Sequence, residues 1–276
     1  KQRPQFDPLI VHVPNVDWLD QLASDTPEVA KRLADLFWPG PLTLVLPKLP
    51  AVPDLVTSGL PTVGVRVPAH PIALELLRVA RLPIAAPSAN PFGRLSPTRA
   101  EHVLEFLGDQ IDLILDGGDC EVGVESTVLQ VGKDQPLLLR PGGVSTEQIE
   151  SAIGPISTVD EKSNPTSKSF ESPGMLPGHY APHTPLVLVD ELTDLPDVER
   201  IGLLTLRPVE DSSRFERIEV LSPEGSLTEA AARFFVALHR LDRFQLDLIV
   251  AITVPEEGIG RALNDRLRRA SYTSSR

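Results

Sequence analysis

The 276-residue sequence is poor in cysteine, in aromatic residues and in long apolar runs. Its single cysteine, Cys120, excludes an intramolecular disulfide and a cysteine-ligated zinc site, which is typical of a reducing compartment. No apolar run approaches the roughly 20 residues that span a bilayer, and the first residues do not resemble a signal peptide. These absences predict a soluble, cytoplasmic protein without a membrane partner.

Positive charge is also scarce. The sequence has 26 Lys and Arg residues and 38 Asp and Glu residues, which gives a net charge of −12. This balance argues against a broad surface that coats nucleic acid, although it leaves room for a local basic pocket. The length and apolar content are sufficient for two domains, each with its own core.

A proline-rich stretch, Ala86–Arg99, follows an apolar run predicted to end a buried strand and leads into a helix with Thr98 as its expected N-cap. The stretch offers short polar side chains with little rotamer entropy to lose, namely Ser88, Asn90 and Ser96. A rigid loop with such groups at the carboxyl end of a strand suits a phosphate or a nucleotide. The alternative is an ordinary proline-rich connection with solvated serines.

The first residues place two cations, Lys1 and Arg3, before an apolar run that ends at His12. In an extended segment this spacing points both cations the same way, so that they can bind one polyphosphate. A solvated surface pair is the alternative. Arg66 stands in a predicted strand, Val63–Val67, where it must either reach solvent or meet an anion such as a carboxylate.

Short strands alternate irregularly with helices in the first half, which predicts a twisted mixed α/β sheet. The expected strands are Leu42–Leu46, Val63–Val67, Leu82–Ala85, Leu113–Leu115, Ser126–Val131 and Leu137–Leu139, and the expected helices include Pro71–Ala80 and Thr146–Ile153. Glycines at Asp116–Gly118 and Gly142–Gly143 are explained as turns. Arg140 precedes the second pair.

A Ser-, Pro- and Gly-rich linker, residues 157–185, separates this half from a second α/β pattern. There the expected strands are Leu186–Val189, Ile201–Leu206, Ile218–Leu221 and Leu246–Thr253, with helices after Ser226 and at Gly260–Ala270. The pattern is Rossmann-like but lacks Gly-x-Gly-x-x-Gly, so no dinucleotide is expected. The arginines of the last helix, Arg261, Arg266, Arg268 and Arg269, are interpreted as a solvated face or as an RNA-facing patch.

Three motifs, Lys-x-Arg-Pro, Pro-Leu-Ile-Val-His and Pro-Ser-Ala-Asn, together resemble the YrdC/Sua5 family, the threonylcarbamoyl-AMP synthases. The Ser-Pro-Gly-Met and His-Tyr-Ala-Pro elements of the linker resemble the long form of that family. The resemblance implies a YrdC-like domain over 1–156, a linker over 157–185 that folds over the active site, and a Rossmann-like Sua5 C-terminal domain over 186–276. It also implies a preceding segment with a Pro-Thr-Glu-Thr-x-Tyr-Gly-Leu motif, which this chain is expected to lack.

The activity implied by the resemblance is synthesis of threonylcarbamoyl-AMP and pyrophosphate from L-threonine, bicarbonate or CO2, and ATP, with Mg²⁺ accompanying ATP. The product would pass to the tRNA threonylcarbamoyl transferase machinery for modification of adenosine 37, and contact with tRNA itself is left open. No metal site is expected in the chain, because Pro182 between His179 and His183 disfavours a helical pair of ligands.

The resemblance also implies the roles of individual residues. The catalytic set is Lys1, Arg3, Ser88 and Asn90. These four are also expected to bind ATP, together with Asp7, Thr62, Ser96, Arg140, His179 and Tyr180. The expected threonine contacts are His12, Arg66, Ala86 and Ser126.

The sequence departs from the family pattern at two places that bear on these roles. Two other functions stand as alternatives. Asp7 stands where relatives usually have asparagine, and a carboxylate near phosphates needs a cation or metal to offset it. Leu-Pro-Gly precedes His179 where many relatives carry Lys-Tyr-Arg. The rivals are a non-catalytic RNA-binding module of the same fold and a related carbamoyl transferase domain.

Overall fold

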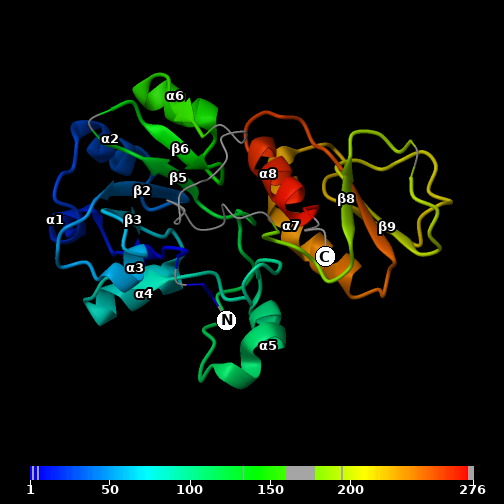
Figure 1. The fold of residues 1–276 in the computed structure, drawn as a ribbon, viewed down its shortest axis with the longest axis horizontal. Coiled ribbons are helices and arrows are strands. Elements are labelled where there is room, and N and C mark those ends of the chain that lie inside the picture. Colours follow the sequence, from blue (N-terminus) through cyan, green and yellow to red (C-terminus); the bar gives the residue numbers. More distant parts are fainter. Residues whose placement is uncertain (2, 5, 133, 160–177, 194, 273–276) are drawn as a thin grey trace. The chain divides into compact units, whose positions relative to one another are not determined.

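The computed structural model describes residues 1–276 except 2, 5, 133, 160–177, 194 and 273–276 (Figure 1). By their contacts, the described residues fall into two units. The seven-stranded unit comprises residues up to Ser88 other than Lys1, and the described part of Glu125–Met175. The four-stranded unit comprises Lys1, Ala89–Val124 and the described part of Leu176–Arg276.

The first unit is built on a mixed sheet with the strand order β4-β1-β3-β2-β5-β6-β7. The strands are β1 Ile10–His12, β2 Leu42–Pro47, β3 Thr62–Arg66, β4 Ile84–Ala86, β5 Thr127–Gln130, β6 Leu137–Arg140 and β7 Ser157–Thr158. The pairs β1/β3, β2/β5 and β6/β7 are parallel, whereas β1/β4, β2/β3 and β5/β6 are antiparallel. The prediction of a mixed α/β sheet is therefore confirmed.

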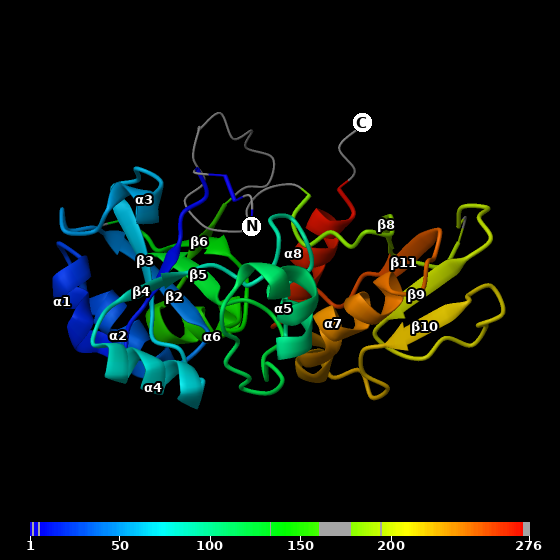
Figure 2. The same cartoon turned by 90° about the horizontal axis from the view of Figure 1, so that it is seen from below.

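Figure 2 shows helices α1, α2, α4 and α6 on one face of the sheet of this unit, whereas α3 lies on the other side. The helical elements are η1 Val16–Trp18, α1 Leu19–Leu22, α2 Glu28–Phe37, α3 Asp54–Thr57, α4 Pro71–Ala80 and α6 Thr146–Ile153. In α2 the buried residues Ala30, Leu33 and Ala34 recur at the spacing of one helix face. They pack with alternate strand residues such as Leu44 and Val65 into the main core.

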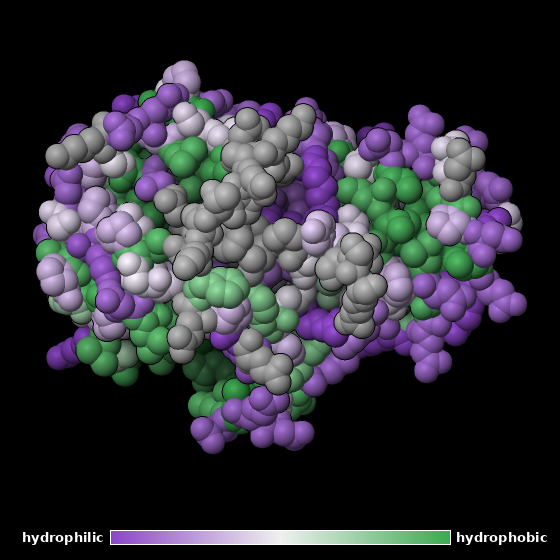
Figure 3. All heavy atoms as spheres, in the orientation of Figure 1, coloured by the Kyte–Doolittle hydropathy of each residue, from purple (hydrophilic) through white to green (hydrophobic). Residues whose placement is uncertain are grey.

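The four-stranded unit contains a fully parallel sheet with the order β10-β9-β11-β8. Its strands are β8 Leu186–Val189, β9 Ile201–Thr205, β10 Arg217–Val220 and β11 Leu248–Ile252. Helices α7 Leu227–Asp242 and α8 Gly260–Ala270 supply apolar residues to the core on one face. Loop residues such as Leu192 and Phe215 pack on the other face. Figure 3 shows hydrophilic side chains along the outer rim of this unit, at the right.

The segment Ala89–Val124 belongs to this unit because it packs on α7. Its helices are α5 Ala100–Leu107 and η2 Gly108–Gln110. The His102 ring stacks on the His239 ring at 3.9 Å between centroids, and Glu105 forms an ion pair with Arg243 at 2.6 Å. Leu95, 1% exposed, lies in the same core as α7.

Two local predictions are wrong. Leu113–Leu115 forms no strand, and Leu113 and Leu115 are exposed, because three apolar residues alone do not secure a pairing partner. Helix α5 begins at Ala100 with Arg99 as its N-cap, so Thr98 is not the cap and is instead buried. Among the described helices, none is long and apolar enough to cross a membrane.

Candidate functional site

The face of the seven-stranded sheet opposite α2, α4 and α6 carries several of the predicted site residues of that unit. Because strand side chains alternate, Val11, Val63 and Val65 enter the helix-covered core, and their neighbours point to the other face. That second face, here called the polar face, bears His12 on β1, Thr43 on β2, Thr62, Gly64 and Arg66 on β3, and Arg140 on β6. A small pocket on it is lined by Thr43, Thr62 and Gly64 together with apolar residues such as Ile10, Val45 and Val128.

His12 and Arg66 are aligned on the adjacent parallel strands β1 and β3, so their side chains lie on the same face. Arg66 Nε donates a hydrogen bond to the Gly40 carbonyl oxygen at 2.9 Å. Burial, followed by the positive charge of Arg66, lowers the pKa of His12 to about 4. The pair therefore presents a neutral imidazole beside a fixed cation at neutral pH, an arrangement that suits an amino acid carboxylate.

Arg140 and Ser126, which were predicted to contact different substrates, form one buried cluster. Arg140 is 3% exposed, and its Nη2 donates to the Ser126 carbonyl oxygen at 2.9 Å and to Ser126 Oγ at 3.2 Å. Ser126 Oγ also lies 2.8 Å from Thr43 Oγ1. Sequence reasoning missed Thr43, although a threonine inside the apolar run Leu42–Leu46 was the available signal.

Gly142 is needed because its backbone lies very close to the backbone of residues 125–127, and not because the chain turns there. A Cβ at this position would lie 2.4 Å from the Glu125 carbonyl oxygen and from backbone atoms of Ser126 and Thr127. Its φ is outside the left-handed region, so conformational freedom is not the reason. The glycine lets the chain after Arg140 lie against Ser126, which corrects the explanation of this glycine as part of an ordinary turn.

The partly exposed Arg3 and the buried Asp7 form an ion pair at the start of the same unit. Arg3 Nη2 lies 2.8 Å from Asp7 Oδ2 and donates to the Pro8 carbonyl oxygen at 2.6 Å. The Asp7 side chain is only 2% exposed. Burial lowers the pKa of Arg3, and the Asp7 charge opposes that shift. The cation that offsets the unusual carboxylate is therefore Arg3.

The other predicted residues of this unit lie at the ends of strands. Ala86 is the last residue of β4 and aligns with Ile10 of β1, and the exposed Ser88 follows two residues later. Thr62 is the first residue of β3 and is half-buried. Strand ends give these residues fixed backbone positions beside the polar face.

Five predicted residues, Lys1, Asn90, Ser96, His179 and Tyr180, are described in the four-stranded unit. Lys1 Nζ donates a hydrogen bond to the Asn90 carbonyl oxygen, and Asn90 Nδ2 donates to the Arg94 carbonyl oxygen at 2.8 Å. The Lys1 ammonium therefore contacts the main chain of Asn90, while the Asn90 side-chain amide is held by Arg94.

His179 and Ser96 lie on the same loop system. The His179 ring packs edge-on against Phe92 with 4.7 Å between centroids, and the Phe92 amide donates to the Lys1 carbonyl oxygen at 3.2 Å. The Ser96 carbonyl oxygen forms a 3.1 Å hydrogen bond with His239 Nε2. The residues Ser172–Pro177, which also carry the family resemblance, lie outside the described residues.

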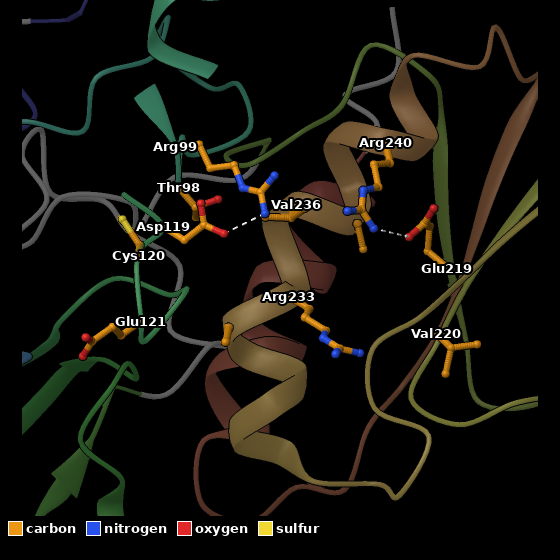
Figure 4. A pocket seen from close by; sticks show the side chains of 12 residues that line it. Thr98, Arg99, Asp119, Cys120, Glu121, Glu219, Val220, Arg233, Val236 and Arg240 are labelled. Carbon is orange, nitrogen blue, oxygen red and sulfur yellow. Dashed lines mark hydrogen bonds and ion pairs between the residues drawn. The ribbon is translucent and has the colours of Figure 1, made fainter. Parts of the chain in front are cut away.

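A separate groove of about 530 Å³ lies between α7 and the segments around Arg99 and Asp119 (Figure 4). Two of its arginines are paired with carboxylates of the same lining: Arg99 bonds Asp119 at 2.7 Å, and Arg240 contacts Glu219 at 3.4 Å. No predicted site residue lines it. Within the described ranges, no group of three or more His, Cys, Asp or Glu side chains could hold a metal ion.

The comparison with family models shows to which family the chain belongs. The model described as "Telomere recombination", which covers the Sua5, YciO and YrdC proteins, matches residues 1–142. The chain belongs to the Sua5/YrdC family. A second model, "Threonylcarbamoyl-AMP synthase, C-terminal domain", matches residues 144–271, so the Sua5/YrdC chain has both parts of the long form.

Individual relatives agree with this Sua5/YrdC assignment. A Pyrococcus abyssi protein named threonylcarbamoyl-AMP synthase is 44% identical over 98% of this chain and 82% of its own length. A Bacillus subtilis protein of the same name is 42% identical over 98% of this chain and 81% of its own length. A crystal structure of P. abyssi Sua5 complexed with L-threonine matches with a TM-score of 0.88 and 40% identity, covering 98% of this chain and 82% of that one. This match confirms the predicted fold class.

Proposed function

We propose that the protein is an L-threonylcarbamoyladenylate synthase. One observation carries the proposal: both domain models match, and relatives named for this activity align over 98% of the chain. The reaction joins L-threonine, CO2 or bicarbonate, and ATP, and it releases pyrophosphate. Its product serves the N6-threonylcarbamoyl modification of adenosine 37 in tRNA.

The chemistry requires placement and charge stabilisation more than a strong base. The threonine amine adds to CO2 and loses a proton, which gives a carbamate. A carbamate oxygen then attacks the α-phosphorus of ATP in line, and the bond to pyrophosphate breaks. A His12 imidazole with a pKa of about 4 is a weak base at neutral pH, which favours a positioning role for it.

For threonine, we assign the carboxylate to Arg66, with His12, Ala86 and Ser126 around the amino acid. The alignment of His12 with Arg66 and the contact of Ser126 with Thr43 support this assignment. The L-threonine in the P. abyssi structure makes an amino acid ligand consistent with the fold.

For ATP, we assign phosphate contacts to Lys1, Arg3, Ser88, Asn90 and Arg140. The remaining proposed ATP contacts are Asp7, Thr62, Ser96, His179 and Tyr180. Mg²⁺ would arrive on the ATP phosphates. The described residues do not form a metal site of their own, and the Asp7 carboxylate is held by Arg3, so no residue is assigned as its ligand.

The same proposal includes two domains over 1–156 and 186–276, with a linker over 157–185 that closes over the site. It also includes a cytoplasmic location and transfer of the product to the tRNA-modifying machinery. Residues 160–177 of the proposed linker lie outside the described residues. The single cysteine, which is free and exposed, supports the cytoplasmic location. The separate match of the C-terminal model supports the second domain.

The test is mass-spectrometric detection of threonylcarbamoyl-AMP after incubation with ATP, Mg²⁺, L-threonine and bicarbonate. The assay uses this chain and a version extended by the expected family segment. We expect an adduct that requires both threonine and bicarbonate and that is strongly reduced by Arg3→Ala. Arg78→Ala is the matched control, because Arg78 lies exposed on α4.

If the extended protein binds ATP but forms no adduct, the synthase proposal is wrong. Strongly salt-dependent RNA binding in that case would favour the RNA-binding module. Formation of a carbamoyl adenylate from ATP and carbamoyl phosphate, with no dependence on threonine, would instead favour the carbamoyl transferase.

A further inference from the structure

Arg266 of α8 is completely buried, at 0% exposure, and is the largest fully buried side chain described. This corrects the interpretation of all four arginines of α8 as a solvated face or an RNA-facing patch. Its charge is balanced by Asp265, whose Oδ2 lies 2.5 Å from Arg266 Nη1. Asp265 also binds Arg269 at 2.8 Å. Burying an ion pair costs desolvation free energy that an apolar side chain in the same place would not cost. The buried pair therefore indicates a role beyond filling the core.

The group that faces this cation is Tyr180. The Arg266 guanidinium carbon lies 5.1 Å from the centre of the Tyr180 ring, within the range of a cation–π contact. Tyr180 is 4% exposed, and its ring also contacts Phe235 of α7 at 5.8 Å. Its backbone φ of 63° lies in the left-handed region, which is uncommon for a bulky residue and needs surrounding contacts to hold it.

The segment around Tyr180 is in turn joined to the loop that carries Asn90. Ala181 forms a parallel bridge with Arg94, and its amide donates to the Gly93 carbonyl oxygen at 2.9 Å. On the Tyr180 side, the His179 ring packs against Phe92. Both contacts lie within four residues of Asn90 along the chain.

We infer that Arg266 is a positioning residue that holds the Tyr180 ring and thereby keeps the 178–182 segment paired with the loop of Asn90. In this proposal Arg266 acts on the loop through Tyr180 and contacts no substrate itself. The functional part of the inference rests on the proposed synthase activity, in which Asn90, His179 and Tyr180 bind ATP. It gives the C-terminal α/β region a role in ATP binding.

The first test reads the position of Tyr180 without any catalysis. The chain has only two tyrosines, so incorporation of 3-fluorotyrosine gives two ¹⁹F NMR signals, and Tyr272→Phe assigns them. We expect Arg266→Met to shift the Tyr180 signal and leave the Tyr272 signal in place. Arg268→Met is the matched control, because Arg268 is an exposed arginine on the same helix.

The second test measures steady-state formation of threonylcarbamoyl-AMP. Arg266→Met is expected to raise KM for ATP about tenfold, as loss of one desolvated contact predicts, with a smaller change in kcat. Tyr180→Leu should raise it by a similar factor, and the double variant by no more than the larger single effect. Independent, multiplying effects would show that Arg266 does not act through Tyr180.

Arg266→Lys guards against a folding defect, because lysine retains a charge for Asp265 but not the planar group above the ring. A folded Lys or Met variant with an unmoved Tyr180 signal and an unchanged KM for ATP overturns the inference. If the extended protein forms no adduct, the synthase proposal fails, and the ¹⁹F result still decides whether Arg266 positions Tyr180.

Discussion

At the residue scale, the Arg3–Asp7 pair sets how much positive charge reaches the proposed phosphate site. We expect Asp7→Asn to lower KM for ATP about fivefold, because Arg3 then keeps its carbonyl contacts but is no longer neutralised by a carboxylate. Initial-rate measurements across ATP concentrations check this. Asp54→Asn is the control, since Asp54 pairs with Lys48 at an exposed position. A raised KM for Asp7→Asn would mean that the negative charge of Asp7 is needed at its proposed ATP contact, rather than weakening the attraction of Arg3 for phosphate.

His12 makes stability depend on pH in a defined window. Its pKa is about 4 in the folded protein and near 6.5 when unfolded, so below pH 6.5 the unfolded state binds more protons. The stability contributed by neutral His12 is complete above pH 6.5 and is lost as the pH falls toward 4, by at most about 1.4 kcal/mol per pH unit. Urea unfolding at pH 7, 6 and 5 should show a shallower decline for His12→Gln than for the parent. Parallel declines would contradict the assignment.

The same residues show what the sequence could predict about the site. Arg66 was found because a charged residue inside an apolar strand needs an explanation, and its alignment with His12 follows from strand pairing. Arg266 was missed because a helix with several arginines is compatible with a solvated face, and only tertiary contacts reveal that one of them is buried. The contact of Arg140 with Ser126 likewise joins residues on different segments of the chain.

At the scale of elements, Gly142 controls the approach of the β6 end to the start of β5. We expect Gly142→Ala to lower the free energy of unfolding by about 3 kcal/mol, because its Cβ would meet backbone atoms that cannot move aside. Gly132→Ala is the matched control, since an added Cβ there meets nothing within 4 Å, and it should change stability by less than about 0.5 kcal/mol. Equal losses measured by urea unfolding would refute the close-approach explanation.

Helices α4 and α6 have clear start signals and were predicted to their bounds. Helix α4 begins at Pro71, which occupies the first helical turn, and α6 is preceded by a capping box of Ser145 and Gln148. The run Leu113–Leu115 had hydrophobicity but no partner strand. Local propensity can be seen in the sequence, whereas pairing depends on what the rest of the chain places alongside.

At the scale of the whole molecule, each of the two units is built from segments that are not contiguous in the sequence. Ala89–Val124 leaves the seven-stranded unit and packs on α7, through Leu95 and through the stacked rings of His102 and His239. Motifs and composition change along the chain, so they suggest contiguous domains, and the predicted boundary at residue 156 stays a prediction. The packing of 89–124 is a long-range property that no local pattern encodes.

This packing predicts the consequence of ending the chain after Thr158. Without α7, the apolar and aromatic faces of the 89–107 segment lose their partners, whereas the core beneath β2 keeps its own helices. Amides of α5 should therefore exchange with solvent at least about 100-fold faster than in the full chain, and those of Leu44 and Leu46 should stay protected. Hydrogen–deuterium exchange read by mass spectrometry measures both regions in one sample. Retained protection in α5 would show that the segment is held by the seven-stranded unit, and loss in both regions that the two units fold only together.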